Sequence, residues 1–150
     1  QCALTVPREL SMRDGKLCQQ PVHEIERMRG DCVCATGGET VEEPGRLFDL
    51  VVSCEGAQVI ELEIRKGVFV RYTDGMLTLD MGNEGYGRDQ RSIELSELRD
   101  LRVLSDTTMV EIFANGGEAA LTSRTYSSAV PAMALHAEGA ASMDFYRLAH

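Results

Sequence analysis

The chain has 150 residues, 43% of them hydrophobic, which is enough for one domain with a substantial core. Acidic residues outnumber basic ones by 24 to 15, so the formal net charge is −9. This charge disfavours nucleic acid and anionic membrane surfaces as partners, because both are negatively charged. No apolar stretch approaches the ~18 residues of a membrane span, and no signal peptide is expected.

The N-terminal region contains the best helical segment of the chain. The segment starts at Pro21, carries glutamates early and arginines late, and stops at Gly30. These features suit the two ends of a helix, so the sequence predicts a helix of about two turns. Residues 36–45 follow with three glycines, one proline and three glutamates but no periodicity, which predicts a surface loop.

Alternation with a period of two dominates the rest of the chain. In residues 58–65, isoleucine and leucine alternate with polar side chains, which predicts a half-buried strand. Asp74-Gly75 and Asn115-Gly116 each predict a hairpin turn, because both residue types tolerate positive φ. The predicted extended segments are residues 47–54, 58–65, 68–72, 77–81, 108–114, 119–126 and 143–148.

Turn signals recur about every ten residues, and helical pattern is scarce. The sequence therefore predicts an all-β fold, a two-layer antiparallel β-sandwich. One short helix is expected near the N-terminus.

Two glutamates, Glu61 and Glu63, form the most suggestive carboxylate pair. Alternate residues of a strand face the same side about 7 Å apart, a distance at which two carboxylates can act on a glycosidic bond. An ordinary exposed strand also carries such glutamates on its solvent face. The sequence therefore assigns no catalytic residue.

Histidines and cysteines do not combine into a metal site in the sequence. His23, His136 and His150 stand far apart, and Cys32-x-Cys34 lacks the second pair of ligands that a zinc site needs. The five cysteines are an odd number without a stapling pattern, which indicates reduced thiols in a cytoplasmic protein. We expect no metal and no cofactor.

The loop of residues 82–87 contains three glycines around Tyr86 and Asn83. A tyrosine raised on glycines can stack on a sugar ring, and an asparagine offers a donor and an acceptor to sugar hydroxyls. The alternative is an ordinary hairpin loop with the tyrosine folded back on the sheet. Both interpretations stay open on the sequence alone.

Residues 101–126 carry a group of side chains at a distinctive spacing. An Asp precedes Glu-x-Phe, then Asn-x-Gly, then Thr-x-Arg-x-Tyr, at Asp106, Glu111, Phe113, Asn115, Gly117, Thr122, Arg124 and Tyr126. This pattern resembles the C-terminal signature of glycoside hydrolase family 32, which comprises invertases, sucrose-6-phosphate hydrolases and fructanases. Residues 4–10 and 13–29 look like the passage from that family's catalytic propeller into its second module. The resemblance thus spans nearly the whole chain.

The resemblance implies a two-module enzyme, in which a five-bladed propeller cleaves terminal β-fructofuranosides. A β-sandwich of the jelly-roll kind found in concanavalin and galectins follows the propeller. The family's catalytic motifs do not carry over to this chain. The chain has no Trp for the nucleophile motif, Arg13-Asp14 is not followed by Pro, and Cys54-Glu55 reverses the acid/base motif. The expected role is therefore non-catalytic support of a propeller in the same polypeptide.

Within this division, residues 1–10 are expected to end or leave the catalytic module, and residues 11–150 to form the sandwich. Asp106 and Glu111 are expected to be structural, accepting hydrogen bonds from the backbone or from Arg124. Two alternatives stay open, an autonomous module that binds fructose-containing saccharides and an independent enzyme with an unrecognised site. A homo-oligomer is also left open.

Overall fold

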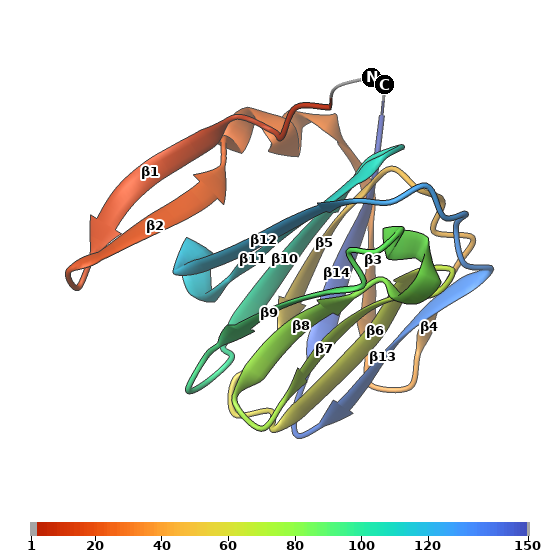
Figure 1. Ribbon diagram of the computed structural model, residues 1–150. Coiled ribbons are helices and arrows are strands. Elements are labelled where there is room, and N and C mark those ends of the chain that lie inside the picture. Colours follow the sequence, from red (N-terminus) through yellow and green to blue (C-terminus); the bar gives the residue numbers. More distant parts are fainter. Residues whose placement is uncertain (1–2, 150) are drawn as a thin grey trace.

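A computed structural model describes residues 3–149 (Figure 1). The strands are β1 (Arg8–Arg13), β2 (Lys16–Pro21), β3 (Arg29–Thr36), β4 (Thr40–Glu42), β5 (Phe48–Ser53), β6 (Val59–Arg65), β7 (Val68–Thr73), β8 (Met76–Asp80), β9 (Gln90–Glu94), β10 (Asp100–Ser105), β11 (Met109–Ala114), β12 (Ala119–Arg124), β13 (Ala132–Glu138) and β14 (Ser142–Leu148). Three short 3₁₀ helices complete the described elements, η1 (His23–Met28), η2 (Gly82–Gly85) and η3 (Asn115–Gly117). None of the helices in residues 3–149 has the length and apolar character needed to cross a membrane.

Two six-stranded antiparallel sheets form the two layers. The first sheet has the order β12-β11-β10-β5-β14-β3, and the second has the order β4-β13-β6-β7-β8-β9. The last two strands of the chain lie inside the sheets, with β14 between β5 and β3 and β13 between β4 and β6. The predicted antiparallel β-sandwich is confirmed.

The core fills the space between the two sheets. Inward-facing residues of both layers belong to one hydrophobic cluster, which includes Phe48, Leu50, Val103, Ile112 and Phe145 of the first sheet and Leu62, Ile64, Val70, Leu79 and Leu135 of the second. The alternation of side chains along each strand explains this shared cluster, because every second residue of a strand faces the partner layer.

A buried arginine also links the two layers. Arg65 of β6 is fully buried, and its Nε and Nη2 atoms donate to Ser105 Oγ of β10 at 3.1 and 2.8 Å. Its remaining donors reach the carbonyl oxygens of Thr107, Ser127 and Arg46. Burial lowers the pKa of Arg65 to about 10, so the side chain keeps its charge at neutral pH.

The predicted hairpins are present, with different turns. Asp74-Gly75 closes a two-residue turn between β7 and β8, with φ angles of 50° and 71°, and Thr73 pairs with Met76. Ala114 pairs with Ala119, so the Asn115-Gly116 signal belongs to a four-residue connection that contains η3.

Other segments differ from the prediction. The expected helix between Pro21 and Gly30 is the 3₁₀ helix η1, of which no residue is fully buried. The predicted loop of residues 36–45 contains β4, which pairs with β13 at the edge of the second sheet.

Strands β1 and β2 form a separate two-stranded sheet that was not predicted. In Figure 1 this hairpin arches away from the sandwich on the side of β12. The predicted boundary between residues 10 and 11 lies inside β1, so the structure keeps both sides of that boundary in one hairpin.

Candidate functional site

The outer face of the first sheet carries the N-terminal segment, residues 6–29. Five residues share this face by register, namely Asp49, Arg102, Glu111, Phe113 and Thr122. Arg102 lies directly opposite Phe113, and Glu111 lies directly opposite Thr122. Asp49 lies opposite Leu104, which is two residues from Arg102 and therefore faces the same side. We call these five residues the anchoring face. They come from four adjacent strands, β5, β10, β11 and β12. Each of them contacts the N-terminal segment through the interactions described below.

Glu111 binds the start of the segment. Its Oε1 accepts a hydrogen bond from the Val6 amide at 2.8 Å, and its Oε2 pairs with Arg8 Nη2 at 2.7 Å. The same Arg8 nitrogen donates to Thr122 Oγ1 at 2.9 Å, and the guanidinium lies 5.1 Å from the Phe113 ring centroid. Since the Glu111 side chain is 4% exposed, this ion pair is well shielded from water.

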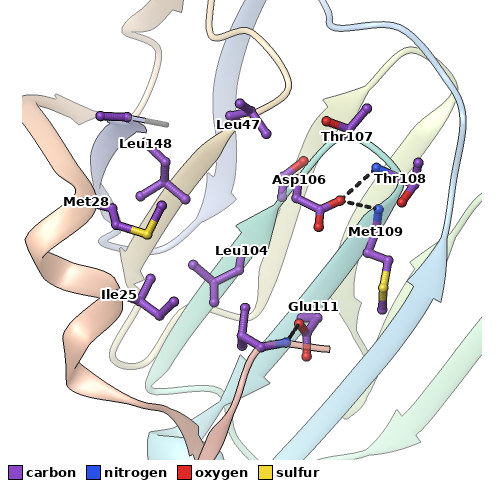
Figure 2. A pocket seen from close by; sticks show the side chains of 13 residues that line it. Ile25, Met28, Leu47, Leu104, Asp106, Thr107, Thr108, Met109, Glu111 and Leu148 are labelled. Atoms are coloured by element: carbon purple, nitrogen blue, oxygen red, sulfur yellow. Dashed lines mark hydrogen bonds between the residues drawn. The ribbon is translucent and has the colours of Figure 1, made fainter. Parts of the chain in front are cut away.

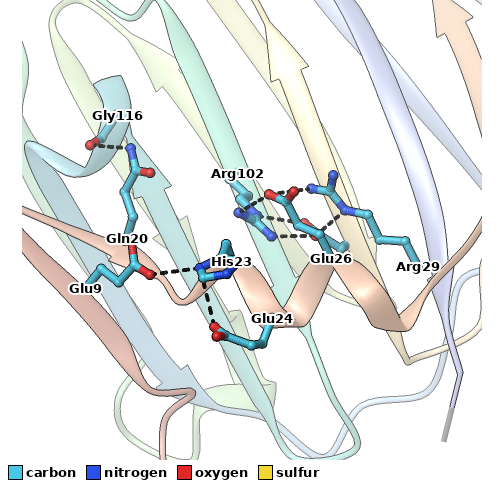
Figure 3. A network of polar contacts seen from close by, with 9 residues as sticks. Glu9, Gln20, His23, Glu24, Glu26, Arg29, Arg102 and Gly116 are labelled. Carbon is cyan, nitrogen blue, oxygen red and sulfur yellow. Dashed lines mark hydrogen bonds and ion pairs between the residues drawn. The ribbon is translucent and has the colours of Figure 1, made fainter.

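Asp49 binds the other end of the segment. It is fully buried and accepts hydrogen bonds from Arg29 Nε at 2.8 Å and from Arg102 Nε and Nη2 at 3.0 and 2.7 Å. Arg102 also reaches Glu26 of η1 at 3.4 Å (Figure 3). Arg29 lies over the ring of Tyr146. A buried carboxylate surrounded by two guanidinium groups thus fixes the exit of η1 to the sheet.

The turn at η3 holds β2 by backbone contact. Gly117 has φ +91°, and a Cβ atom there would lie 2.0 Å from the carbonyl oxygen of Gln19. The neighbouring Gly116 carbonyl accepts a hydrogen bond from Gln20 Nε2 at 2.6 Å. Only glycine permits this close approach, which explains the glycine of the Asn-x-Gly pattern. The asparagine of that pattern, Asn115, accepts from the Arg99 amide and donates to the Glu97 carbonyl.

A pocket of about 380 Å³ opens between η1 and the strands β10 and β11 (Figure 2). Its lining is mostly apolar and includes Ile25, Met28, Leu104 and Leu148. Both carboxylates at its rim have partners in the backbone, since Asp106 Oδ1 accepts from the amides of Thr108 and Met109 at 2.7 and 2.9 Å and Glu111 accepts from Val6. These partners favour a structural role for the two carboxylates.

Asp106 and Glu111 are predicted to accept hydrogen bonds from the backbone or from Arg124, and the structure shows backbone donors to both carboxylates. Within residues 3–149, the ion pair of Glu111 is made by Arg8, and Asp106 caps its own turn. Arg124 Nη2 donates to the Tyr126 hydroxyl at 2.5 Å. The cation that pairs with Glu111 thus comes from the N-terminal segment, about a hundred residues away in the sequence.

The predicted sugar-contact residues lie on another part of the surface. Tyr86 is 77% exposed and meets Tyr126 edge to face, with 6.3 Å between the ring centroids. Arg88 and Arg124 line the same hollow of about 200 Å³. Asn83 lies in η2 and accepts a hydrogen bond from the Tyr86 amide through its carbonyl oxygen, but it is not one of the residues that line the hollow.

Glu61 and Glu63, which the sequence left unassigned, both have local partners. Glu61 accepts from Arg71 Nε at 2.7 Å, and Glu63 Oε1 accepts from the Gly67 amide at 2.9 Å. Arg71 also pairs with Asp80. These contacts are those of a solvent-exposed sheet surface.

The comparisons with known proteins agree on one family. Residues 59–148 match the family described as glycosyl hydrolases family 32 C terminal. The chain is 37% identical to raffinose invertase of Escherichia coli over 84% of this chain and 29% of that protein. It is 29% identical to the sucrose-6-phosphate hydrolase of Vibrio alginolyticus over 82% of this chain and 27% of that protein.

Solved structures agree on the fold. A sucrose-6-phosphate hydrolase from Lactobacillus gasseri superposes with a TM-score of 0.80 at 21% identity, over 95% of this chain and 33% of that one. A glycoside hydrolase family 32 structure from Bifidobacterium adolescentis gives 0.79 at 22% identity, over 96% of this chain and 25% of that one. The chain thus spans a third or less of each of these four proteins. Because the family match covers more than half of its residues, the chain belongs to glycosyl hydrolase family 32 as a C-terminal domain.

Proposed function

We propose that this chain is the C-terminal β-sandwich of a β-fructofuranosidase of the sucrose-6-phosphate hydrolase type, and that it supports a catalytic β-propeller of the same polypeptide. The names and greater lengths of its relatives support the parent activity. No residue of the chain is assigned a catalytic role in this proposal. The free thiols of Cys18, Cys32, Cys34 and Cys54 support a reducing compartment such as the cytoplasm.

The observation that carries the proposal is the incomplete hairpin β1–β2. Its strands pair only with each other among the described residues, so each has one edge without a strand partner. Leu10, Met12 and Leu17 share one face by register and are 65%, 69% and 54% exposed. A two-stranded sheet with an exposed apolar face is marginal alone, so such a hairpin indicates a missing β-rich partner.

The anchoring face makes this hairpin a firm connection. Arg8 is held by Glu111 and Thr122, and the Gln19 backbone lies against Gly117. Leu4, which precedes the hairpin, is 90% exposed, so the apolar surface extends along the segment. A partner bound to the hairpin would therefore be coupled rigidly to the sandwich.

The test replaces Leu10, Met12 and Leu17 together with serine. We expect little change in the unfolding free energy of the 150-residue chain, because these side chains are already in water. In a polypeptide that joins the chain to the catalytic part of the E. coli raffinose invertase, we expect sucrose hydrolysis to be lost at a lower temperature. Residual activity after heating measures this.

A matched control replaces Gln90 and Arg91, exposed residues on the edge strand β9, with serine. The control should leave the heat resistance of the joined polypeptide unchanged. Equal heat resistance of the triple variant and the unaltered polypeptide would contradict the proposal. Release of fructose from sucrose by the 150-residue chain alone would contradict it as well.

A second candidate function, carbohydrate binding, is favoured by the tyrosine pair. Tyr86 and Tyr126 present two aromatic rings beside two arginines in one hollow, which suits a sugar ring and its hydroxyls. The exposure of Tyr86 supports this candidate over a tyrosine packed down on the sheet. Asn83 stays a predicted contact only.

Titration with sucrose, fructose and fructan oligosaccharides tests the second candidate. We expect amide chemical-shift changes centred on residues 85–88 and 124–126 at millimolar sugar, and their loss in Tyr86→Ala. Tyr126→Phe keeps the ring and serves as the conservative control. Unchanged spectra at millimolar sugar would eliminate carbohydrate binding by this domain.

A further inference from the structure

Two thiols and a carboxylate meet on the outer face of the first sheet, at its β3 edge. Cys32 and Cys34 are alternate residues of β3, so both side chains point to the exposed side, and their Sγ atoms lie 3.3 Å apart. Asp144 of β14 pairs directly with Cys34 in the strand register. One carboxylate oxygen and the two sulfur atoms all lie within 4.8 Å of one another.

The distances fit a tetrahedral thiophilic cation. Zinc binds thiolate sulfur at about 2.3 Å, which places two sulfur ligands of a tetrahedral site roughly 3.8 Å apart. The two Sγ atoms need to separate by only about half an ångström to reach that spacing. Within the part of the chain that the structure describes, strand β3 pairs with another strand on one side only, so a shift of this size disturbs few contacts.

The donor set also selects the class of ion. Two sulfur atoms and one oxygen suit zinc and similar soft or borderline cations, whereas magnesium and calcium prefer oxygen ligands alone. A disulfide is a poor alternative, because residues i and i+2 of an extended strand have Cα atoms about 6.7 Å apart, at the far limit for that bond. The strand geometry therefore keeps both sulfurs available as ligands.

Another acidic group on the surface fits a metal less well. Glu9, His23 and Glu24 also lie within 4.8 Å of one another, and all three are exposed. The hydrogen bond with Glu9 raises the pKa of His23, which favours the protonated ring that does not bind metal. This group contains no thiol, so it serves as an internal comparison.

Contrary to the expectation from the sequence, we propose that Cys32, Cys34 and Asp144 bind zinc or a similar thiophilic divalent cation, with a solvent water as the fourth ligand. Three protein ligands and an exposed fourth position are the arrangement of an open site, not of a closed structural one. Because the ligands come from two strands, a bound ion fastens the edge strand β3 to β14. The proposal does not depend on the proposed parent enzyme.

The test titrates the reduced 150-residue chain with Cd²⁺, in a Cys2→Ser background that removes a thiol outside the described residues. We expect a sulfur-to-cadmium charge-transfer band in the ultraviolet that saturates at one ion per chain. Zinc should displace the cadmium, and a rise of Tm with added zinc should accompany binding. Cys32→Ser and Cys34→Ser should each weaken binding by at least about tenfold, and the double variant should lose the band.

The variants Asp144→Asn and Asp31→Asn distinguish metal ligation from a change of net charge. Each removes one negative charge near Cys32, but only Asp144 is a proposed ligand. Asp144→Asn should weaken cadmium binding, while Asp31→Asn should leave it unchanged. The circular dichroism spectrum of each variant serves to check that the variant folds. Absence of the band at stoichiometric cadmium, or a band that persists in the double cysteine variant, would overturn the proposal.

Discussion

Replacement of Asp49 with alanine is expected to lower the free energy of unfolding by about 3 kcal/mol or more. The carboxylate is fully buried and is bound by both Arg29 and Arg102. Without it, two guanidinium groups that are 17% and 16% exposed keep their positive charges side by side. Urea denaturation followed by circular dichroism measures the loss.

Glu61→Ala is the matched control for Asp49→Ala. Glu61 pairs with Arg71 at 2.7 Å, the same distance at which Asp49 meets Arg102, but its side chain is 43% exposed. An exposed ion pair contributes about 0 to 1 kcal/mol, so this variant should lose little stability. Equal losses in the two variants would show that the burial of Asp49 has no energetic consequence, contrary to the prediction.

Replacement of Glu111 with alanine is expected to cost about 2 to 3 kcal/mol of unfolding free energy. The change leaves Arg8, which is 19% exposed, without its ion pair and leaves the Val6 amide without its acceptor. The variant should also loosen the hairpin itself, because Val6 and Arg8 lead into it. Faster hydrogen exchange and faster proteolysis in residues 4–21 should accompany the loss.

A double-mutant cycle with Arg8→Met tests whether Glu111 acts through Arg8. The two changes together should cost clearly less than the sum of the single costs, with a coupling energy of about 1 to 3 kcal/mol. Thr122→Val, which removes the second acceptor of Arg8 Nη2, should have a smaller effect of about 1 kcal/mol. A coupling energy near zero would refute the Glu111–Arg8 anchor.

Several of the strands that face the core could be predicted from the sequence, because their side chains alternate between the core and solvent, whereas β10 and β13 were not predicted. Residues 58–65 and 68–72 show this clearly, and the structure has β6 and β7 there. The hairpin β1–β2 was missed, although Asp14-Gly15 separates its strands as Asp74-Gly75 separates β7 and β8. Its alternation is short, and its apolar residues face solvent instead of the core.

The anchoring face could not be predicted in the same way. Arg8 and Glu111 are 103 residues apart, and Asp49 and Arg102 are 53 apart. No local period relates such positions, since the relation exists only after β5, β10 and β11 lie side by side. A charged residue gives the same sequence pattern whether its side chain is buried or exposed. The sequence therefore did not predict that Asp49 is buried.

The placement of β13 and β14 has a consequence for biosynthesis. Both sheets receive an interior strand from the last twenty residues of the domain, between neighbours made much earlier. Neither layer can close until residues 132–148 have left the ribosome, so most pairings between distant strands must wait for this segment. Such long-range topology slows folding, and a nascent sandwich would need shielding from aggregation until these two strands are available for pairing.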